Sequence, residues 1–369
     1  MHLKNLQLNQ FKNYKQAKLE FSTEINCFVG INGSGKTNLL DAIHYLCLTK
    51  SAVNAQDSQN ILHEQDFFTV FGDFDMDAKT LEIRCVVESG KKKQLIQNGK
   101  PIEKMSEHVG LLPVVMIAPD DTLLIKDGSE ERRRFFDNML CQLDKTYLES
   151  LVRYQHFLKQ RNALLKQFAD TNRVNKPLLE PYDREIIQLS MQIAKARERF
   201  LEEYKPLLLD HYADISGRQE NISIQYDSDC LESDFERAFL QNQQKDLILK
   251  RTTMGIHKDD FVFEIDNYPI KKFGSQGQQK SFVIALKLAQ FEIFFAHKET
   301  KPILLLDDIF DKLDDHRIEK LMKLVANHKF GQLFITDARP ERSKSILREI
   351  DSNAKFFMVD SGAVGIWDQ

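Results

Sequence analysis

One octapeptide carries the strongest fold signal in this 369-residue chain: Gly30-Ile31-Asn32-Gly33-Ser34-Gly35-Lys36-Thr37. It fits the pattern GxxxxGK[ST], and it lies between an apolar run, Ile25 to Val29, and a segment with helical spacing that begins at Asn38. Glycines let successive backbone N–H groups curl around phosphate oxygens, and the helix that follows adds the positive end of its dipole. We therefore predict a phosphate-binding loop, in which Lys36 contacts the β- and γ-phosphates of ATP and the Thr37 hydroxyl is a ligand of Mg²⁺.

A pair of carboxylates supplies the second half of such a site. Ile303 to Leu306 is an apolar run that predicts a buried strand, and Asp307 and Asp308 follow it directly. We expect Asp307 to hold Mg²⁺, directly or through water, and Asp308 to orient or deprotonate the attacking water. Lys36 and Asp308 are thus the candidate catalytic residues. Phosphate loops also occur in kinases, GTPases, helicases and transporters, so these two motifs alone identify only a nucleotide-binding domain.

A third motif, Ser275-Gln276-Gly277-Gln278, precedes an apolar segment with helical spacing that runs from Gln278 to Phe295. By itself this tetrapeptide is typical of a plain helix cap. In series with the other two motifs it resembles the signature motif of the ABC ATPase superfamily, which docks on the γ-phosphate held by a second subunit. Asp311, Leu313 and Asp314 likewise resemble the superfamily's loop that touches the nucleotide of the partner subunit. The resemblance implies that ATP joins two copies of the chain and that hydrolysis releases them.

The pattern of apolar residues changes twice along the chain. The first 120 or so residues alternate as strands do, residues 130–209 have apolar positions at helical spacing, and strands return after about Arg251. A strand, helix, strand order near the C-terminus indicates a parallel sheet. We therefore expect an α/β fold: an ABC-type phosphate-loop ATPase head with mixed β-sheets over residues 1–125 and 246–369, and an inserted, mainly helical lobe over residues 126–245.

Composition excludes several classes of protein. With 42% hydrophobic and 29% charged residues, the chain can bury a large core, which argues against disorder. Its net charge of −4 argues against a bulk-basic, histone-like DNA binder, although a local basic surface remains possible. No apolar run approaches the ~18 to 20 residues of a membrane helix, and no secretory signal begins the sequence, so we expect a cytoplasmic location. Five scattered cysteines without a CxxC pair are expected to be reduced thiols.

Several further segments resemble one family, the RecF family of bacterial DNA replication and repair proteins. The interval of 238 residues between Thr37 and Ser275 is too long for a transporter ATPase and too short for a chromosome-organising protein with a long coiled coil. The segments that carry the resemblance are Leu8-Asn9-Gln10-Phe11-Lys12-Asn13-Tyr14, Pro119-Asp120-Asp121, Glu131 to Asp137, Leu158 to Leu165, Gly255-Ile256-His257-Lys258-Asp259-Asp260-Phe261 and Ser275-Gln276-Gly277-Gln278-Gln279.

The resemblance implies a function. It implies a weak ATPase that dimerises on ATP and binds single-stranded and double-stranded DNA at gaps and junctions. It further implies that the protein works with RecO and RecR to load RecA at gaps and supports the SOS response. Asp308 stands where many ABC ATPases have Glu, and its shorter side chain is consistent with slow hydrolysis. Lys12 and Lys258 stand where the family commonly has Arg, and lysine lacks the planar fork that makes bidentate contacts.

Other functions stay open on the sequence alone. The main alternative is an ABC-type ATP switch that acts on protein partners without DNA. A small-molecule kinase with the same phosphate loop and a transporter ATPase are less favoured, the first because of the Ser275 motif and the second because of the long insertion. For Arg132, Arg133 and Arg134 we favour a structural or lobe-contact role over DNA contact, because Glu130 and Glu131 adjoin them. His257 fits a structural or a functional role equally well.

Overall fold

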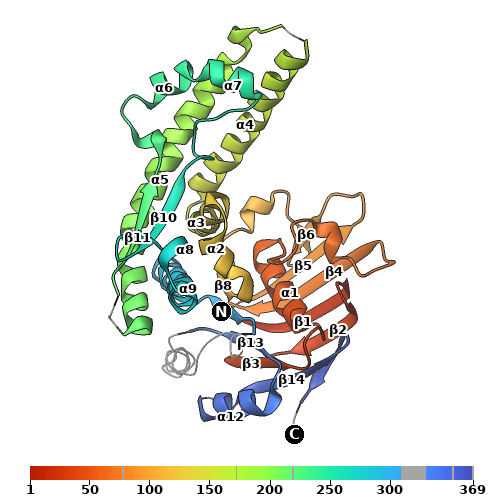
Figure 1. Cartoon of the computed structure of the whole chain (residues 1–369). Coiled ribbons are helices and arrows are strands. Elements are labelled where there is room, and N and C mark those ends of the chain that lie inside the picture. Colours follow the sequence, from red (N-terminus) through yellow and green to blue (C-terminus); the bar gives the residue numbers. More distant parts are fainter. Residues whose placement is uncertain (77–78, 172, 218–219, 309–329, 351–352, 368–369) are drawn as a thin grey trace. The chain divides into compact units, whose positions relative to one another are not determined.

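The structure is a computed structural model, and it describes residues 1–76, 79–171, 173–217, 220–308, 330–350 and 353–367 (Figure 1). Contacts between residues divide the chain into two compact units. Met1–Asp121 and Gln290–Gln369 form the first unit, and Thr122–Ala289 forms the second. The partner-facing loop predicted at Asp311, Leu313 and Asp314 lies outside the described residues.

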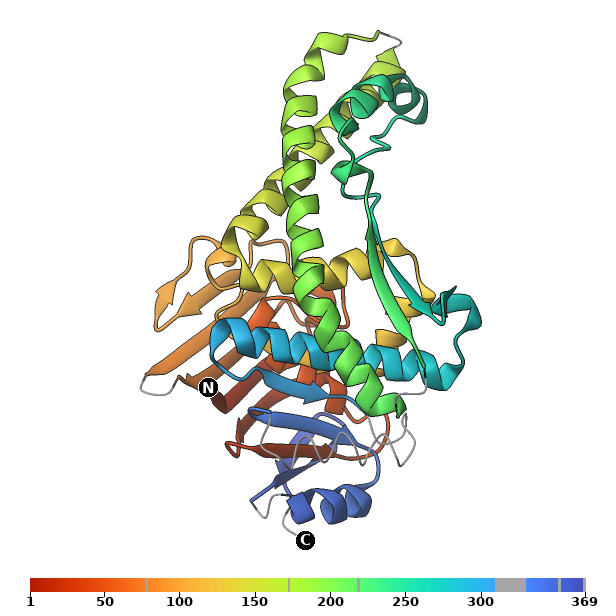
Figure 2. The same cartoon turned by 90° about the vertical axis from the view of Figure 1, so that its left-hand side faces the viewer.

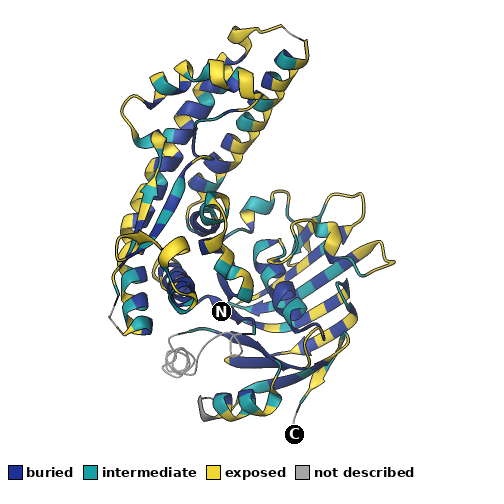
Figure 3. Cartoon of the chain, viewed as in Figure 1, coloured by how far each residue is buried: buried dark blue, intermediate teal, exposed yellow. Residues whose placement is uncertain are grey.

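The first unit contains an antiparallel sheet built from the N-terminal strands. Its order is β2-β1-β4-β5-β6-β7. Burial alternates along the strands, as the period of two in the sequence predicts, so one face packs on the core and the other faces solvent (Figure 3). The strands are β1 (His2–Phe11), β2 (Tyr14–Glu20), β4 (Phe67–Asp75), β5 (Thr80–Glu88), β6 (Gln94–Gln97) and β7 (Lys100–Pro101).

A second sheet of the first unit has the order β15-β14-β3-β13-β12-β8 and is parallel except for the pair β14 and β15. Its four strands β3, β8, β12 and β13 are buried at every position, as expected for parallel strands covered on both faces. The strands are β3 (Ile25–Val29), β8 (Val114–Ile117), β12 (Ile303–Leu306), β13 (Leu333–Asp337), β14 (Lys355–Asp360) and β15 (Ala363–Ile366).

Helix α1 (Lys36–Leu48) contacts both sheets of the first unit, and α12 (Pro340–Ile350) packs beside β3. One apolar core joins the two sheets and α1. Within it the ring of Phe21 packs edge-on against the rings of Phe28, Phe334 and Phe357, which come from three neighbouring parallel strands. Because β3, β12 and β13 are parallel, their carboxyl ends meet at one edge of the sheet.

The second unit is built on two long helices, α4 (Lys145–Thr171) and α5 (Glu180–Ser216), which pack along each other (Figure 2). Helix α7 contacts α4, and α6 contacts α5. A three-stranded antiparallel sheet has the order β11-β10-β9. The remaining elements are α2 (Leu123–Lys126), α3 (Ser129–Leu143), α6 (Phe235–Gln241), α7 (Gln243–Leu249), β9 (Ile222–Asp227), β10 (Asp260–Ile265), β11 (Tyr268–Pro269), α8 (Ile270–Phe273) and α9 (Gln276–Lys298). The division between the two units falls inside α9, after Ala289.

The division of the chain differs from the expected one. The expected boundary after residue 125 lies four residues from the observed division, whereas the expected boundary after residue 245 does not coincide with the division after Ala289. Residues 246–289 belong with the second unit because β10 pairs with β9 along its whole length and the Tyr204 hydroxyl donates to the carbonyl of Leu286 at 2.5 Å. The second unit therefore contains a sheet as well as helices.

Two expectations from composition can be compared with the structure. Within the described ranges, no helix combines the length and the apolar character needed to cross a bilayer. All five cysteines are free thiols, and all but Cys141 are buried. Burial raises the pKa of these buried thiols, for example to about 12 at Cys85 and Cys230, so they are protonated at neutral pH.

Candidate nucleotide-binding site

The predicted phosphate loop follows β3 after Val29 and enters α1 at Lys36. It therefore joins the carboxyl end of an inner strand of the parallel sheet to a helix N-terminus. Gly35 has a φ of 115°, and a Cβ atom there would lie 2.4 Å from Nδ2 of Asn13, so only glycine fits. The first turn of α1 contains no acidic residue and no side-chain cap. No carboxylate in this turn repels an anion, and the positive end of the helix dipole favours one.

Lys36 lies in this loop with 7% of its surface exposed. Its ammonium donates to the carbonyls of Gly30, at 2.7 Å, and Ile31, at 2.9 Å. The positive charge therefore lies beside the backbone carbonyls of the loop that the sequence predicts to bind phosphate. Ile31, Asn32 and Gly33 are exposed, so the outer part of the loop is open to solvent.

Thr37 and Asp307 are hydrogen-bonded to each other, although 270 residues separate them in sequence. The Thr37 hydroxyl lies 2.9 and 3.0 Å from the two carboxylate oxygens of Asp307, which follows the last residue of β12. Neighbouring oxygen ligands of octahedral Mg²⁺, at about 2.0 to 2.1 Å from the metal, are themselves separated by roughly 2.9 Å. The two side chains therefore fit Mg²⁺ as adjacent ligands. Burial raises the pKa of Asp307, while the hydroxyls of Thr336 and Thr37 and the charge of Lys36 oppose that rise.

Thr336 is a further site residue, and the sequence analysis missed it. Its fully buried hydroxyl donates to Oδ1 of Asp307 at 2.7 Å and accepts from the backbone N–H of Asp308 at 2.8 Å. It thus fixes both carboxylate residues at the end of β12. The signal was present in the order of the strands: Thr336 lies at the end of the predicted strand next in the chain, and Ile335 pairs with Leu306 in parallel register. At Asp308 the φ of 48° marks a sharp change of backbone direction.

The hairpin between β1 and β2 supports the loop and was also missed as part of the site. Asn13 donates to the carbonyl of Ser34 at 3.1 Å and accepts from Nδ2 of Asn38 at 2.7 Å. The Tyr14 hydroxyl donates to the carbonyl of Gly35 at 2.9 Å. Lys12 forms a buried ion pair with Asp41 of α1 at 2.6 Å. The family-like segment Leu8 to Tyr14 carried this signal, but only the fold brings it to the loop.

The signature-like tetrapeptide lies in the second unit, at the N-terminus of α9. The Ser275 hydroxyl accepts from the backbone N–H of Gln278 at 3.2 Å, and Oε1 of Gln278 accepts from the backbone N–H of Ser275 at 2.6 Å. These reciprocal bonds are a capping box, so the plain-cap interpretation of the sequence is correct for this chain by itself. Ser275 and Gln276 are exposed, and Gly277 and Gln278 are half-buried. A cap and a contact to another molecule are compatible, because the cap leaves these residues at the surface.

The three arginines of α3 have structural partners. Arg132 forms a bidentate pair with Asp260, at 2.8 and 2.9 Å, and Arg133 donates to the carbonyl of Asp259 at 2.6 Å. Arg134 alone pairs with the adjoining glutamates, Glu130 and Glu131.

His257 is also held inside the second unit. Its Nε2 lies 3.1 Å from the carbonyl of Thr252 and its Nδ1 lies 2.7 Å from the hydroxyl of Tyr154. Since a carbonyl only accepts, Nε2 carries the proton of the neutral ring, and Nδ1 accepts from the tyrosine. Burial lowers the pKa of His257 to about 4, so the ring is neutral at physiological pH.

The whole chain matches proteins of one family. A family model described as the RecF/RecN/SMC N terminal domain matches residues 2–364. Proteins named DNA replication and repair protein RecF from Cytophaga hutchinsonii and Flavobacterium johnsoniae are 49% and 46% identical, over 99% and 97% of this chain and 96% and 99% of their own lengths. The chain belongs to the RecF family.

Comparison with solved structures agrees with the assignment of the chain to the RecF family. Two structures of the recombination mediator protein RecF in the RecFOR pathway, with ATPrS and with ATP, are each 28% identical to this chain, with TM-scores of 0.88 and 0.89. Each match covers 99% of this chain, and the two matches cover 98% and 97% of the lengths of the two solved chains. An Smc head domain from Pyrococcus furiosus, with a TM-score of 0.57 at 18% identity over 99% and 96% of the two chains, shares the fold alone. The predicted α/β ABC-type head fold, with mixed sheets and a helical part, is confirmed.

Proposed function

We propose that this RecF-family protein is an ATP-dependent DNA-binding protein of recombinational repair and replication. The observation that carries the proposal is the convergence of Thr37 and Asp307 beside the loop that holds Lys36. The residues Gly30 to Thr37 hold the phosphates of ATP, and Thr37 and Asp307 hold Mg²⁺, which when bound neutralises charge on the β- and γ-phosphates. Asp308 orients or deprotonates the attacking water, and hydrolysis is slow.

Dimerisation on ATP is the switch in this proposal. Ser275, Gln276, Gly277 and Gln278 of one copy dock on the γ-phosphate held by another, together with the loop of Asp311, Leu313 and Asp314. The exposure of Ser275 and Gln276 at a helix N-terminus supports this role, because N–H groups at such an end attract phosphate. Asp308→Asn is expected to bind ATP and to stay dimeric longer than the wild type, measured by size-exclusion chromatography with ATP. Faster release of the dimer in that variant would remove Asp308 from its role.

DNA is the proposed substrate of the switch. The protein binds single-stranded and double-stranded DNA at gaps and junctions, mainly through phosphates, and works in the cytoplasm with RecR and RecO to load RecA, in support of the SOS response. Family membership and the names of the relatives, which refer to DNA replication and repair, support this part. The RecFOR pathway named for two similar structures supports the choice of RecO and RecR.

The test is fluorescence anisotropy of a labelled gapped duplex, titrated with and without ATP and Mg²⁺, with Lys36→Ala as the control. Lys36 lies in the ligand loop, where its ammonium donates to backbone carbonyls, so the variant is expected to fold and to lose ATP binding. Tight binding that requires both ATP and Lys36 supports the proposal. Equal binding under all conditions separates the nucleotide site from DNA, and no binding favours the alternative, an ATP switch that acts on protein partners.

A further inference from the structure

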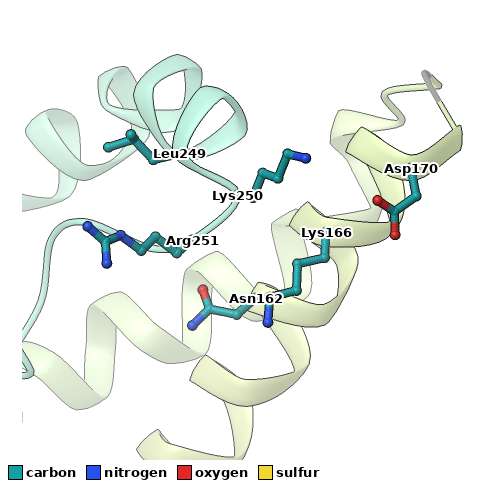
Figure 4. Close-up of a pocket in the computed structure, with 6 residues that line it drawn as sticks. All are labelled: Asn162, Lys166, Asp170, Leu249, Lys250 and Arg251. Carbon is teal, nitrogen blue, oxygen red and sulfur yellow. The ribbon is translucent and has the colours of Figure 1, made fainter.

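A basic notch lies in the second unit, between α4 and the chain that follows α7 (Figure 4). Its volume is about 440 Å³. Asn162, Lys166 and Asp170 line one wall at intervals of four residues, which places them on one face of α4. Leu249, Lys250 and Arg251 line the other wall. Neither the nucleotide site nor the signature-like motif uses any of these residues.

Both walls of the notch are held by polar contacts, some half-buried and some buried. The Asn162 carboxamide oxygen accepts from the backbone N–H and the hydroxyl of Thr252, at 2.7 and 2.8 Å, which ties the chain after Arg251 to α4. Beneath it, Arg161 is completely buried and pairs with Asp183 of α5 at 2.6 Å and Asp246 of α7 at 2.7 Å. The backbone that carries Lys250 and Arg251 is therefore fixed relative to α4, so the spacing of the two walls is fixed before any ligand arrives.

The two chain segments that form the notch carry an excess of exposed cations. Lys166, Lys250 and Arg251 are exposed, and they form no ion pair with other described residues. Four more exposed cations lie in the same two stretches of chain: Lys159, Arg173, Lys176 and Lys245. In the described residues of 159–178 and 241–251, Asp170 is the one exposed carboxylate. This excess stands out in a chain whose net charge is −4.

We propose that the notch binds the sugar–phosphate backbone of a nucleic acid, with Lys166, Lys250 and Arg251 contacting phosphates. This inference rests on the proposed function, because it names the surface through which DNA is held. A backbone with regularly spaced phosphates matches cations that are distributed along two chain segments, and the planar fork of Arg251 suits a phosphate. The contact does not depend on base sequence, since phosphates carry no sequence information.

The test measures binding of a fluorescein-labelled duplex at several KCl concentrations, with ATP and Mg²⁺ present. Lys250→Gln/Arg251→Gln removes two positive charges from the notch, and Lys195→Gln/Lys205→Gln removes two from exposed positions on α5. The notch variant is expected to bind about tenfold more weakly at low salt, and its slope of log K against log[KCl] should be shallower by about 0.9 for each phosphate that the variant no longer neutralises. The α5 variant should keep the wild-type slope.

The outcomes separate the two proposals. If the wild type binds duplex and both variants keep its affinity and salt slope, the notch is not the DNA-binding surface. The proposed function then still stands. Equal weakening of both variants also overturns the notch, because general charge then explains the weaker binding. Wild-type protein that fails to bind duplex overturns the proposed function and the notch together. Circular dichroism spectra of the variants check that the helices of the second unit remain folded, and Lys250→Arg/Arg251→Lys, which keeps both charges, should recover most of the binding.

Discussion

Among single residues, Thr336 links the carboxylate of Asp307 to the backbone of Asp308. Thr336→Val keeps the shape of the side chain but removes the donor to Asp307 and the acceptor for the N–H of Asp308. We expect the free energy of unfolding to fall by about 1 to 3 kcal/mol, because buried polar groups are left without partners. Urea unfolding measures this loss, and Thr336→Ser should restore most of it. A Val variant as stable as the wild type would show that the hydroxyl is not needed.

His257 predicts a pH dependence of stability. Its pKa is lowered to about 4 by burial, from about 6.5 in an unfolded chain. Between these values the unfolded state binds more protons than the folded state, so the histidine's contribution to stability is present above about pH 6.5 and is lost as the pH falls toward 4. His257→Gln should therefore lose less stability than the wild type between pH 7 and pH 4.5, by urea titration followed at 222 nm. Parallel losses in the two proteins would contradict this.

The residues that could be predicted from the sequence were those with a local pattern. Lys36 and Thr37 stand in a recognisable loop, and Asp307 follows an apolar strand. Thr336 and Asn13 have no such local pattern, because each acts through hydrogen bonds to residues that the fold brings near. Arg132 and Arg133 were expected to pair with the adjoining glutamates, whereas the fold brings them to Asp260, the first residue of β10, and to the carbonyl of Asp259 just before it.

At the scale of elements, two arginines of α4 pair with α5 and differ in burial. Arg161 and its partners Asp183 and Asp246 are at most 2% exposed, whereas Arg153 and Glu185 are 60% and 34% exposed. Arg161→Ala leaves two buried carboxylates without their cation and is expected to cost about 3 to 5 kcal/mol of unfolding free energy. Arg153→Ala is the matched control, with an expected cost below about 1 kcal/mol. Similar costs for both would mean that burial does not govern these pairs.

The periodicity of apolar residues predicts most of the helices and strands. It does not predict which strands pair in a sheet. The apolar run Ile25–Val29 coincides with strand β3, and the segment with helical spacing from Gln278 to Phe295 lies within α9, Gln276–Lys298. Periodicity says nothing about which strands lie side by side, so the pairing of β10 with β9 across the intervening α6 and α7 could not be foreseen. Because of that pairing, residues 246–289 lie in the second unit and not in the ATPase head, where we expected them.

On the scale of the whole molecule, the chain divides into two compact units, and we expect these units to unfold in two steps. The single tryptophan, Trp367, packs against Phe356 in the first unit and reports on that unit, whereas the long helices of the second unit dominate circular dichroism at 222 nm. ATP and Mg²⁺ should stabilise the transition seen by fluorescence, by about 2.7 kcal/mol at a hundredfold excess over Kd, with less effect on the second transition. Lys36→Ala should abolish the shift. Identical midpoints by both probes would indicate one cooperative unit.

The composition of the parallel sheet also bears on the synthesis of the chain. Strand β3, apolar at four of its five positions and buried at all of them, has only β13 and β14 as neighbours in that sheet, and these begin at Leu333 and Lys355. A ribosome that adds about 5 to 20 residues per second needs roughly 15 to 60 seconds to travel from Val29 to Leu333. During that time the nascent strand has no native partner on either side, and for most of it the phosphate loop attached to it has no carboxylate to face. The nascent chain therefore carries an unpaired apolar strand, and its nucleotide site can form only after Asp307 and Thr336 have been synthesised.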